Sequence, residues 1–459
     1  MKNIFLTEET IKSKIHKVYL FLALFIGMSF SLAMPLFSEP DGMFHYTVTT
    51  NIAKLSNDLS AYGESRIGTN FSTQVMNYQQ GTIFEKYYKN KIKEMPMEDL
   101  PRESSFPSIM NYNFWGHLIP AVGIRIGHAI YPSIGVMIIC ARLFTTLMCS
   151  LAMFFIIRWV KAGKLLFFVV SLSPIISSSF ASLSYDSTTY VIAAFIVALA
   201  INILVKQNVE KLDYIWMLLS TIALLLGAKT NIKLFAVLVP LVMISTYIRN
   251  KELKLPFIET WKKKKLATWK WASLSILLVI VMILFVYLVR PTLFFTLQRI
   301  AISFLINISP GLDVSNLFQT LLVAPIANIN YVPYWVSAIW YILLVLVLFS
   351  DTKYVSSPFI AYTSLGLFLV GFLAVYYSYA TYIGGGLTVT QSRYIGAIGG
   401  MQGRYFTPTL LLLSLFAGYQ KFKFKVTQYR LVMIFSILVI VVSNFMLIFG
   451  TLFGFYNLS

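Results

Sequence analysis

An apolar stretch near the start of the chain, Val18–Phe37, reads VYLFLALFIGMSFSLAMPLF and decides the fold class. It is about as long as an α-helix must be to cross the hydrocarbon core of a bilayer. Lys12, Lys14 and Lys17 precede it, but no small-x-small cleavage site follows, so we expect an uncleaved first membrane helix rather than a signal peptide. The segment Ser38–His45, SEPDGMFH, comes directly after it.

The composition extends this prediction to the whole chain. Hydrophobic residues make up 58% of the sequence and charged residues 12%, with a mean hydropathy of +0.73, whereas soluble domains are about 25% charged. We therefore predict an all-α polytopic membrane protein, with residues 1–459 forming one integral membrane domain. The apolar runs bounded by charge predict eleven spans: Val18–Phe37, Ile134–Ile157, Leu165–Ala181, Tyr190–Val205, Tyr214–Leu226, Leu234–Ile248, Trp271–Val289, Tyr334–Phe349, Phe359–Tyr382, Phe406–Tyr419 and Leu431–Leu452.

The net charge of +19 raises the question of nucleic acid, and the positions of the basic residues answer it. Of the 37 Lys and Arg, 22 fall in short segments between spans, whereas residues 38–130 hold 8 basic and 9 acidic residues. This is the positive-inside pattern, so we expect the N-terminus in the cytoplasm and no nucleic-acid partner. It also favours two short helices on either side of Gly227 over one long kinked helix, because both flanks of that region look cytoplasmic.

Three segments are then expected on the outer face. Residues 38–133 form the first extracytoplasmic loop, with candidate surface helices at Met43–Leu55 and Tyr112–Ile130. Residues 290–333 form the second, with room for a re-entrant piece, and residues 383–405 form a Gly-rich third. Loops of this size usually cover a site or carry function.

Asp41 is the first candidate for chemistry, because an ionised carboxylate beside hydrocarbon needs a partner or access to water. His45 follows four residues later, so a helix beginning near Pro40 would place both side chains on one face. Glu39 adds a second acid. Pro and Asp are also common at helix starts, so a plain helix cap at Asp41 explains the same pattern.

Further charged residues fall where the membrane makes them costly. Arg142 lies within the second span, where a charge costs about 3 kcal/mol on insertion scales, so it needs an ion-pair partner or a ligand. Asp186 opens the fourth span, where a helix cap is the simpler explanation. Several basic residues lie on the expected outer side, where the positive-inside rule disfavours them: Lys229, Lys233, Arg393 and Arg404. Headgroup anchoring explains one such residue, whereas several near one carboxylate indicate a phosphate site, which guanidinium groups suit.

The Cys and His residues indicate no metal site. Cys140 and Cys149 both lie in the second span, where we expect free thiols. His117 and His128 are eleven residues apart, about three helical turns, and a core or interfacial role fits them better than metal binding. No cofactor is predicted, and the sequence does not decide whether a divalent metal assists.

The motif Pro40-Asp41-x-x-x-His45-Tyr46 resembles the Pro-Asp-Glu-Pro-Ala-His-Phe motif of a bacterial domain-of-unknown-function family, the one numbered twenty-one forty-two. The resemblance covers residues about 18 to 420, with later landmarks in the same order at Arg142-Leu143, Ser184-Tyr185-Asp186, Gly227-Ala228-Lys229 and Gln402-Gly403-Arg404-Tyr405-Phe406. This sequence departs from the motif at Gly42 and Met43, which stand where the family has Glu and Pro.

The family is similar to the GT-C glycosyltransferases, which take a sugar from a polyprenyl-phosphate carrier on the outer membrane face. The resemblance implies a GT-C-like bundle and a general base at Asp41, with Glu39 as the reserve acid and His45 completing the catalytic set. Base catalysis and cations for the departing phosphate are what such a transfer requires. The predicted substrate-binding residues are Arg404, Lys229, Arg393, Arg142, Asp186, Gln402 and Tyr405.

Three functions follow as hypotheses for a bacterial cytoplasmic membrane protein with an extracytoplasmic active site. The first is inverting transfer of a sugar from an undecaprenyl-phosphate donor to a surface glycan, glycolipid or teichoic-acid-like acceptor. The second is a flippase or transporter of lipid-linked oligosaccharides, which predicts a repeat architecture that the sequence lacks. The third is a polysaccharide polymerase, which differs from the first in its lipid-linked oligosaccharide donor. Membrane lipids are partners in all three.

Overall fold

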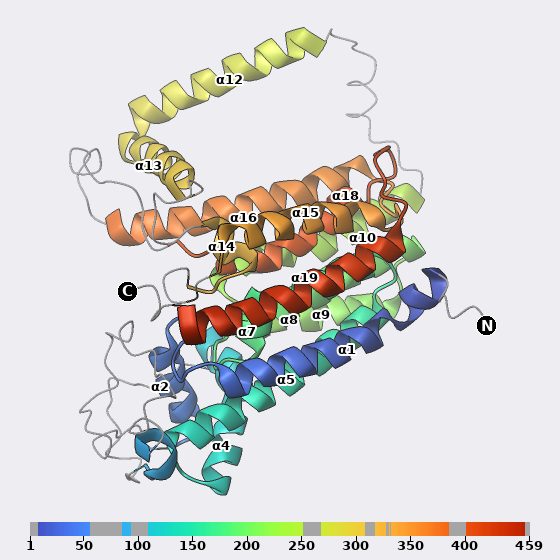
Figure 1. Ribbon diagram of the computed structural model, residues 1–459. Coiled ribbons are helices and arrows are strands. Elements are labelled where there is room, and N and C mark those ends of the chain that lie inside the picture. The colour runs from blue at the N-terminus through green and yellow to red at the C-terminus, as the bar shows by residue number, and fades with distance from the viewer. Residues whose placement is uncertain are drawn as a thin grey trace.

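The computed structural model describes residues 8–55, 85–92, 109–250, 268–307, 317–326, 330, 332–384 and 401–454. In these residues the chain is almost entirely helical and contains no β-strand beyond one isolated bridge, Val355 to Tyr419. The α-helices, drawn in Figure 1, are α1 (Glu8–Ala33), α2 (Gly42–Ile52), α4 (Tyr112–Ile130), α5 (Ile134–Trp159), α6 (Lys164–Ser171), α7 (Pro174–Phe180), α8 (Asp186–Lys206), α9 (Lys211–Gly227), α10 (Leu238–Asn250), α12 (Thr268–Val289), α13 (Pro291–Asn307), α14 (Leu317–Leu322), α15 (Tyr334–Ser350), α16 (Pro358–Gly384), α18 (Leu413–Ala417) and α19 (Tyr429–Phe449). Three 3₁₀ segments, Thr230–Val237, Gly403–Tyr405 and Thr407–Leu412, and two short π-helical turns, Glu85–Lys89 and Gly450–Gly454, complete the set.

The helices confirm an all-α polytopic membrane protein. Six of the described helices are long and apolar enough to cross a membrane: Lys12–Ala33, Ile134–Trp159, Asp186–Lys206, Thr230–Asn250, Pro358–Ala380 and Tyr429–Phe453. Shorter apolar helices accompany them at Ile280–Val289, Pro291–Leu305, Tyr334–Ser350 and Thr407–Ala417. Most lie roughly parallel in one bundle, while α12 stands apart and is joined to it through α13 (Figure 1).

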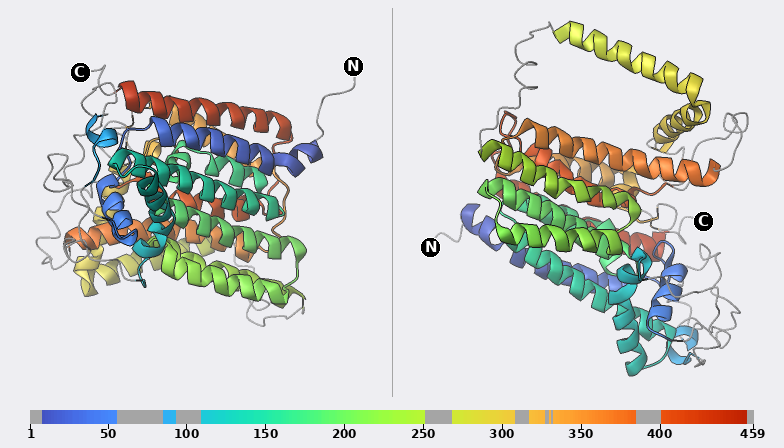
Figure 2. Two further views of the ribbon diagram at one scale, coloured as in Figure 1. Left: turned by 90° about the horizontal axis from the view of Figure 1, so that it is seen from below. Right: turned by 180° about the vertical axis from the view of Figure 1, so that it is seen from behind.

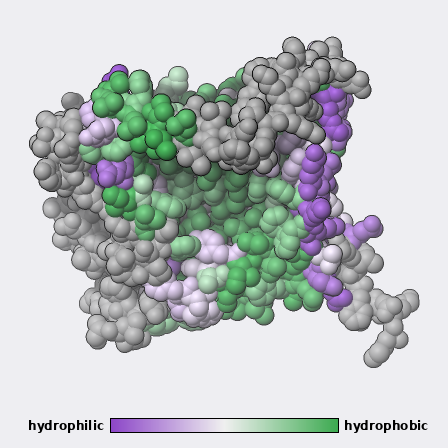
Figure 3. Space-filling view, turned by 90° about the horizontal axis from the view of Figure 1, so that it is seen from above, coloured by the Kyte–Doolittle hydropathy of each residue, from purple (hydrophilic) through white to green (hydrophobic). Residues whose placement is uncertain are grey.

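Charged residues mark one end of this bundle. The ends of α5, α8 and α10 and the starts of α6 and α9 meet there, and we call it the basic end; its cations include Arg158, Lys164, Lys206, Lys211 and Arg249. Hydrophilic residues line one edge of the molecule in Figure 3, beside a largely hydrophobic surface. The segregation of charge that the sequence predicts is therefore present in the fold.

The third predicted span is not one helix. Pro174 lacks an N–H and disfavours a helical conformation in the residue before it, so α6 ends at Ser171 and α7 begins at Pro174. The break leaves carbonyls without intrahelical donors inside the bundle. Asn444 of α19 donates its Nδ2–H to the Leu172 carbonyl at 2.9 Å, which satisfies one of them.

The fifth and sixth predicted spans are separate helices. This agrees with the charge pattern, because two flanks on the same side of the membrane require an even number of crossings between them. Asn250 at the end of α10 donates to the carbonyl of Gln207, which lies just before α9, so the chain returns to the end from which α9 starts. Both helices pack on α8, and Figure 2 shows the three running side by side.

Two predicted boundaries are wrong. The first span was expected to reach Phe37, but α1 ends at Ala33 because Pro35 cannot continue the helix. The tenth was expected as one helix over Phe406–Tyr419, but it is divided into a 3₁₀ segment, Thr407–Leu412, which contains Pro408, and the short helix α18.

The segments predicted to lie on the outer face contain helices that hold the site. The predicted surface helix Tyr112–Ile130 is α4, and Met43–Leu55 corresponds to α2. The segment 290–333 contains α13 and α14 in its described part. Gly123 and Gly127 let α4 pack directly on α5, since a Cβ at either would lie 2.5 to 2.6 Å from the backbone of Ala141 or Met137.

Candidate functional site

The turn between α1 and α2 presents Asp41 at the end of the bundle opposite the basic end, which we call the site end. Two of its residues have left-handed backbone conformations, Phe37 at φ 62° and Asp41 at φ 56°. Asp tolerates this conformation, whereas an aromatic residue rarely adopts it, so the turn requires support from its surroundings.

Arg142 of α5 supplies that support. Its guanidinium donates to the carbonyls of Met34 and Pro35 at 2.8 and 2.9 Å, and its Nη2 lies 2.5 Å from Glu39 Oε2. Both side chains of this ion pair are buried, with 1% and 6% of their surfaces exposed. The partner that the sequence requires for Arg142 is therefore Glu39, and these contacts fix the chain just before Asp41.

Asp41 occupies the N-cap position of α2, yet its side chain makes no capping hydrogen bond. Its Oδ2 instead lies 3.1 Å from Arg404 Nη2. The Asp41 side chain is 58% exposed and that of Arg404 only 4%, so the pair joins an accessible carboxylate to a buried cation. Such a carboxylate can still accept a proton or a hydrogen bond from a ligand.

Arg404 also binds Asp186, the first residue of α8, through Nη1 at 3.1 Å. Lys229 Nζ lies 2.5 Å from the other oxygen of Asp186. Burial disfavours the charge of Arg404, but Tyr405, Asp186 and Asp41 outweigh this effect and raise its pKa. The four charged groups form a neutral network of two carboxylates and two cations.

Aromatic rings enclose the network. The Lys229 ammonium lies 4.6 Å from the centroid of Tyr185 and 4.3 Å from that of Tyr405, within the range of cation–π attraction. Burial raises the pKa of Tyr185 well above its ordinary value, so its hydroxyl stays protonated. Lys229 is thus held by a carboxylate and two ring faces.

His45 packs against Tyr185 and pairs with His117 of α4. His45 Nδ1 and His117 Nε2 are 2.8 Å apart, and His117 Nδ1 lies 2.5 Å from the Asn113 carbonyl. A carbonyl only accepts, so His117 carries its proton on Nδ1 and His45 donates from its own Nδ1. Burial lowers both pKa values, that of His117 to about 4, so the pair is neutral.

Gly403 places Arg404 by allowing close contact with α14. A Cβ at Gly403 would lie 2.2 Å from the Leu321 nitrogen, and the Gly403 N–H donates to Thr320 Oγ1 at 2.7 Å. The close backbone approach expected at Gly403 is therefore present, and its partner is α14. The sequence had indicated a functional role only for the whole segment 290–333, and not for Leu317–Leu322 in particular.

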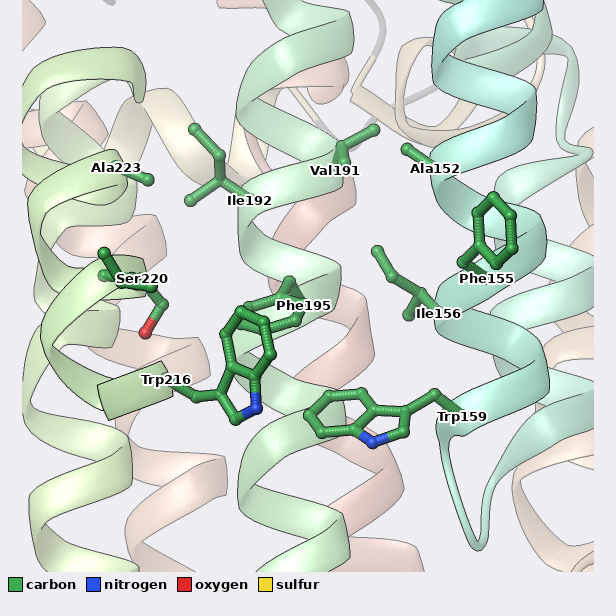
Figure 4. Close-up of a pocket in the computed structure, with 11 residues that line it drawn as sticks. Ala152, Phe155, Ile156, Trp159, Val191, Ile192, Phe195, Trp216, Ser220 and Ala223 are labelled. Atoms are coloured by element: carbon green, nitrogen blue, oxygen red, sulfur yellow. The ribbon is translucent and has the colours of Figure 1, made fainter. Parts of the chain in front are cut away.

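The described surroundings of the network leave little free volume. Two cavities of about 10 Å³ adjoin Arg404, each large enough for about one water. A far larger groove of about 500 Å³ lies between α5, α8 and α9. Figure 4 shows its apolar lining, with Trp159 and Trp216 toward the basic end and Val191, Ile192 and Ala223 at the other end.

The groove begins close to the network. Ile192 Cδ1 would lie 3.1 Å from a Cβ at Gly227, two residues before Lys229. The Lys229 N–H also donates to Thr189 Oγ1, less than one turn before the first groove residue of α8. The apolar groove and the cation site are therefore adjacent along α8 and α9.

A family model for predicted membrane proteins, DUF2142, matches residues 24–413 of this chain. The chain belongs to the DUF2142 family. No curated protein and no solved structure matches it significantly.

In this DUF2142 protein the residues predicted from sequence separate into groups. Asp41, Asp186, Lys229, Arg404 and Tyr405 meet at the network. Glu39 and Arg142 are paired with each other behind it, and His45 with His117. Gln402 precedes the 3₁₀ turn of Arg404, while Arg393 lies outside the described residues.

The remaining predictions concern Lys233, the cysteines and His128. Lys233 lies in the 3₁₀ segment after Lys229, and both cysteines are free thiols, as expected. His128 is half-buried on α4, whereas His117 is fully buried, so the two do not share one environment. Among the described residues no group of three or more His, Cys, Asp or Glu is placed to hold a metal.

Proposed function

We propose that this DUF2142 protein is a membrane glycosyltransferase that moves a sugar from a polyprenyl-phosphate donor to an acceptor hydroxyl at the site end. The observation that carries the proposal is the pairing of an exposed carboxylate, Asp41, with a buried guanidinium, Arg404, beside an apolar groove. In this proposal Asp41 is the base, Arg404 binds the phosphate and the groove holds the isoprenoid chain.

Asp41 serves as the general base. Its side chain is 58% exposed, so an acceptor hydroxyl can reach the carboxylate while Arg404 holds it in place. A positioned base contributes roughly 10²- to 10⁴-fold to such a reaction. Glu39, the reserve acid, is buried against Arg142 and acts on the position of Asp41 instead.

Arg404 and Lys229 attract the phosphate. Arg404 Nε is buried and has no hydrogen-bond partner among the described residues, so this guanidinium retains a donor for a phosphate oxygen. The network is neutral, so a phosphodiester adds a single negative charge beside two cations. Negative charge that develops on the leaving phosphate is stabilised by the same fixed cations.

The groove between α5 and α9 takes the isoprenoid chain. Its lining is almost wholly apolar. Its end nearer the site end adjoins Gly227, which lies two residues before Lys229. A lipid with its phosphate at the cations and its tail in this groove would remain within the membrane. The donor would then reach the site laterally, without crossing water.

The experiment is a transfer assay in proteoliposomes with a panel of undecaprenyl-phosphate hexoses and a lipid-extract acceptor fraction. We expect release of undecaprenyl phosphate with wild type and none above background with Asp41→Asn. Asp351→Asn, at the basic end, is the control and keeps wild-type activity. Equal release by wild type and Asp41→Asn contradicts Asp41 as base, and no release from any donor contradicts the proposed function.

A further inference from the structure

Tyr405 is half-buried at the site end, and its hydroxyl oxygen accepts hydrogen bonds from neighbouring side chains. Tyr379 of α16 donates its O–H to Tyr405 Oη at 3.1 Å, and Arg404 Nη2 approaches the same oxygen at 3.5 Å. The Tyr405 oxygen thus accepts from two donors. No acceptor for its own proton is present in the part of the chain that the structure describes.

Two cations also act on the ring. Lys229 Nζ lies 4.3 Å from the ring centroid and Arg404 Cζ lies 5.1 Å from it. Burial opposes ionisation of the phenol, but Arg404, Lys229 and the Tyr379 hydrogen bond outweigh it and lower the pKa of Tyr405. A more acidic O–H is a stronger hydrogen-bond donor to an anion.

The position of Tyr405 directs that donor toward the network. Its side chain lines the same water-sized cavity as Asp186, Lys229 and Arg404. The Asn231 side chain donates to the Tyr405 carbonyl at 2.8 Å, which fixes the backbone of this residue. The groups that act electrostatically on the phenol are Arg404, Lys229, Tyr379, Asp186, Tyr185 and Tyr112.

We infer that Tyr405 is a catalytic hydrogen-bond donor to the phosphate of the ligand, and that its O–H bonds the oxygen that leaves the sugar. This inference rests on the proposed function and adds a third phosphate contact to Arg404 and Lys229. As the acceptor oxygen bonds to the sugar carbon and gives its proton to Asp41, the bond from that carbon to the phosphate oxygen breaks and its electron pair stays on the phosphate oxygen. The proton remains on Tyr405 throughout, and its hydrogen bond strengthens as the negative charge grows.

The first test measures binding rather than transfer, so it remains valid if no sugar is moved. Farnesyl phosphate and farnesol are the probes, titrated into wild type, Tyr405→Phe and Tyr379→Phe in nanodiscs. We expect Tyr405→Phe to weaken farnesyl phosphate binding about 10-fold and to leave farnesol unchanged. Tyr379→Phe keeps the phenol but removes its donor, so the loss is about 3-fold.

Equal binding of farnesyl phosphate by wild type and Tyr405→Phe overturns the inference, as does an equal loss for farnesol. If Tyr405→Phe does not fold, Tyr379→Phe decides alone: unchanged phosphate affinity in that variant overturns the inference. Ultraviolet titration of tyrosinate gives a further readout. Because the pKa of Tyr405 is lowered, one tyrosine that ionises below the ordinary phenol range is expected to be lost in Tyr405→Phe, and its ionisation to move upward in Tyr379→Phe or when farnesyl phosphate is bound.

The second test concerns turnover and separates this inference from the proposed function. If wild type transfers sugar, Tyr405→Phe lowers kcat about 100-fold with little change in the KM for the acceptor. If wild type transfers no sugar but Tyr405→Phe still weakens phosphate binding, the proposed function fails and the phosphate contact stands. A wild-type kcat in Tyr405→Phe contradicts the catalytic role.

Discussion

Arg404 Nη2 lies 3.1 Å from Asp41 Oδ2, although 363 positions of sequence separate the two residues. The contact brings the turn after the first membrane helix to the 3₁₀ segment that precedes α18. It gives the accessible carboxylate a fixed cationic partner, as the proposed transfer of a sugar from a phosphate ester requires. The predictions below test the parts that hold this contact.

Replacing Asp41 tests the base while leaving the fold intact. Asp41→Asn is expected to lower the transfer rate by roughly 10²- to 10⁴-fold, because a general base is lost. The exposed half of this ion pair contributes less than about 1 kcal/mol to stability, so the thermal unfolding temperature should barely move. Both quantities are measured on the same purified protein. A large fall in unfolding temperature would show a structural role instead.

Breaking the buried pair of Glu39 and Arg142 should, in contrast, mainly lower the stability of the protein. Arg142→Met leaves a buried carboxylate without its partner and is expected to destabilise the protein by about 3 kcal/mol or more. The double variant with Glu39→Gln should recover part of this loss. Unfolding in detergent, followed by intrinsic fluorescence, measures both, and additive effects of the two substitutions would contradict direct pairing.

Glycine positions offer a matched steric test. Gly403→Ala forces a methyl group to within 2.2 Å of the Leu321 nitrogen and is expected to cost about 1 to 3 kcal/mol and to displace Arg404. At Gly366 of α16 an added Cβ meets nothing within 4 Å, so Gly366→Ala should be neutral or slightly stabilising. Similar unfolding temperatures for the two variants would argue against tight packing on α14.

The histidine pair predicts how stability depends on pH. Burial holds the pKa of His117 at about 4 and that of His45 well below 6.5, so the unfolded chain takes up protons first as pH falls. The contribution of the pair is therefore complete above about pH 6.5 and is lost progressively toward pH 4. Unfolding temperature against pH measures this slope. His117→Gln should flatten it, whereas His128→Gln on the same helix should not.

Filling the apolar groove tests the site of the isoprenoid chain. Ala223→Trp places a large ring among the groove residues and is expected to weaken binding of undecaprenyl phosphate several-fold by exclusion. Leu218→Trp, on the exposed face of α9, is the control and should bind as wild type does. Binding of inorganic phosphate should be equal in both. Unchanged lipid affinity in Ala223→Trp would place the tail elsewhere.

The sequence predicted the helical class, the charge segregation and most members of the network because each follows from local rules. A membrane span, a helix terminus and a cation placed against the charge rule can be recognised one segment at a time. The position of Arg142 also predicted an ion-pair partner, since a charge inside a membrane span must be compensated.

The pairings could not be predicted, because they depend on long-range packing. Nothing local distinguishes Glu39, which is buried against Arg142, from Asp41, which is exposed, although they are two residues apart. The roles of α14 behind Gly403 and of Tyr379 beside Tyr405 likewise exist only once distant segments meet. The predicted helix boundaries were wrong where a proline ended the helix within an apolar run, at Pro35, Pro174 and Pro408.

The pair of Arg142 and Glu39 leads us to expect an order in the insertion of the chain into its membrane. A charged residue within α5 opposes entry by about 3 kcal/mol when the helix enters alone. Glu39 is synthesised 103 residues earlier, in the turn after α1, so its carboxylate is already present when α5 emerges. The first two long helices should therefore enter the bilayer as a hairpin. A nascent chain that loses α1 before α5 arrives would leave α5 poorly inserted and open to quality-control proteolysis.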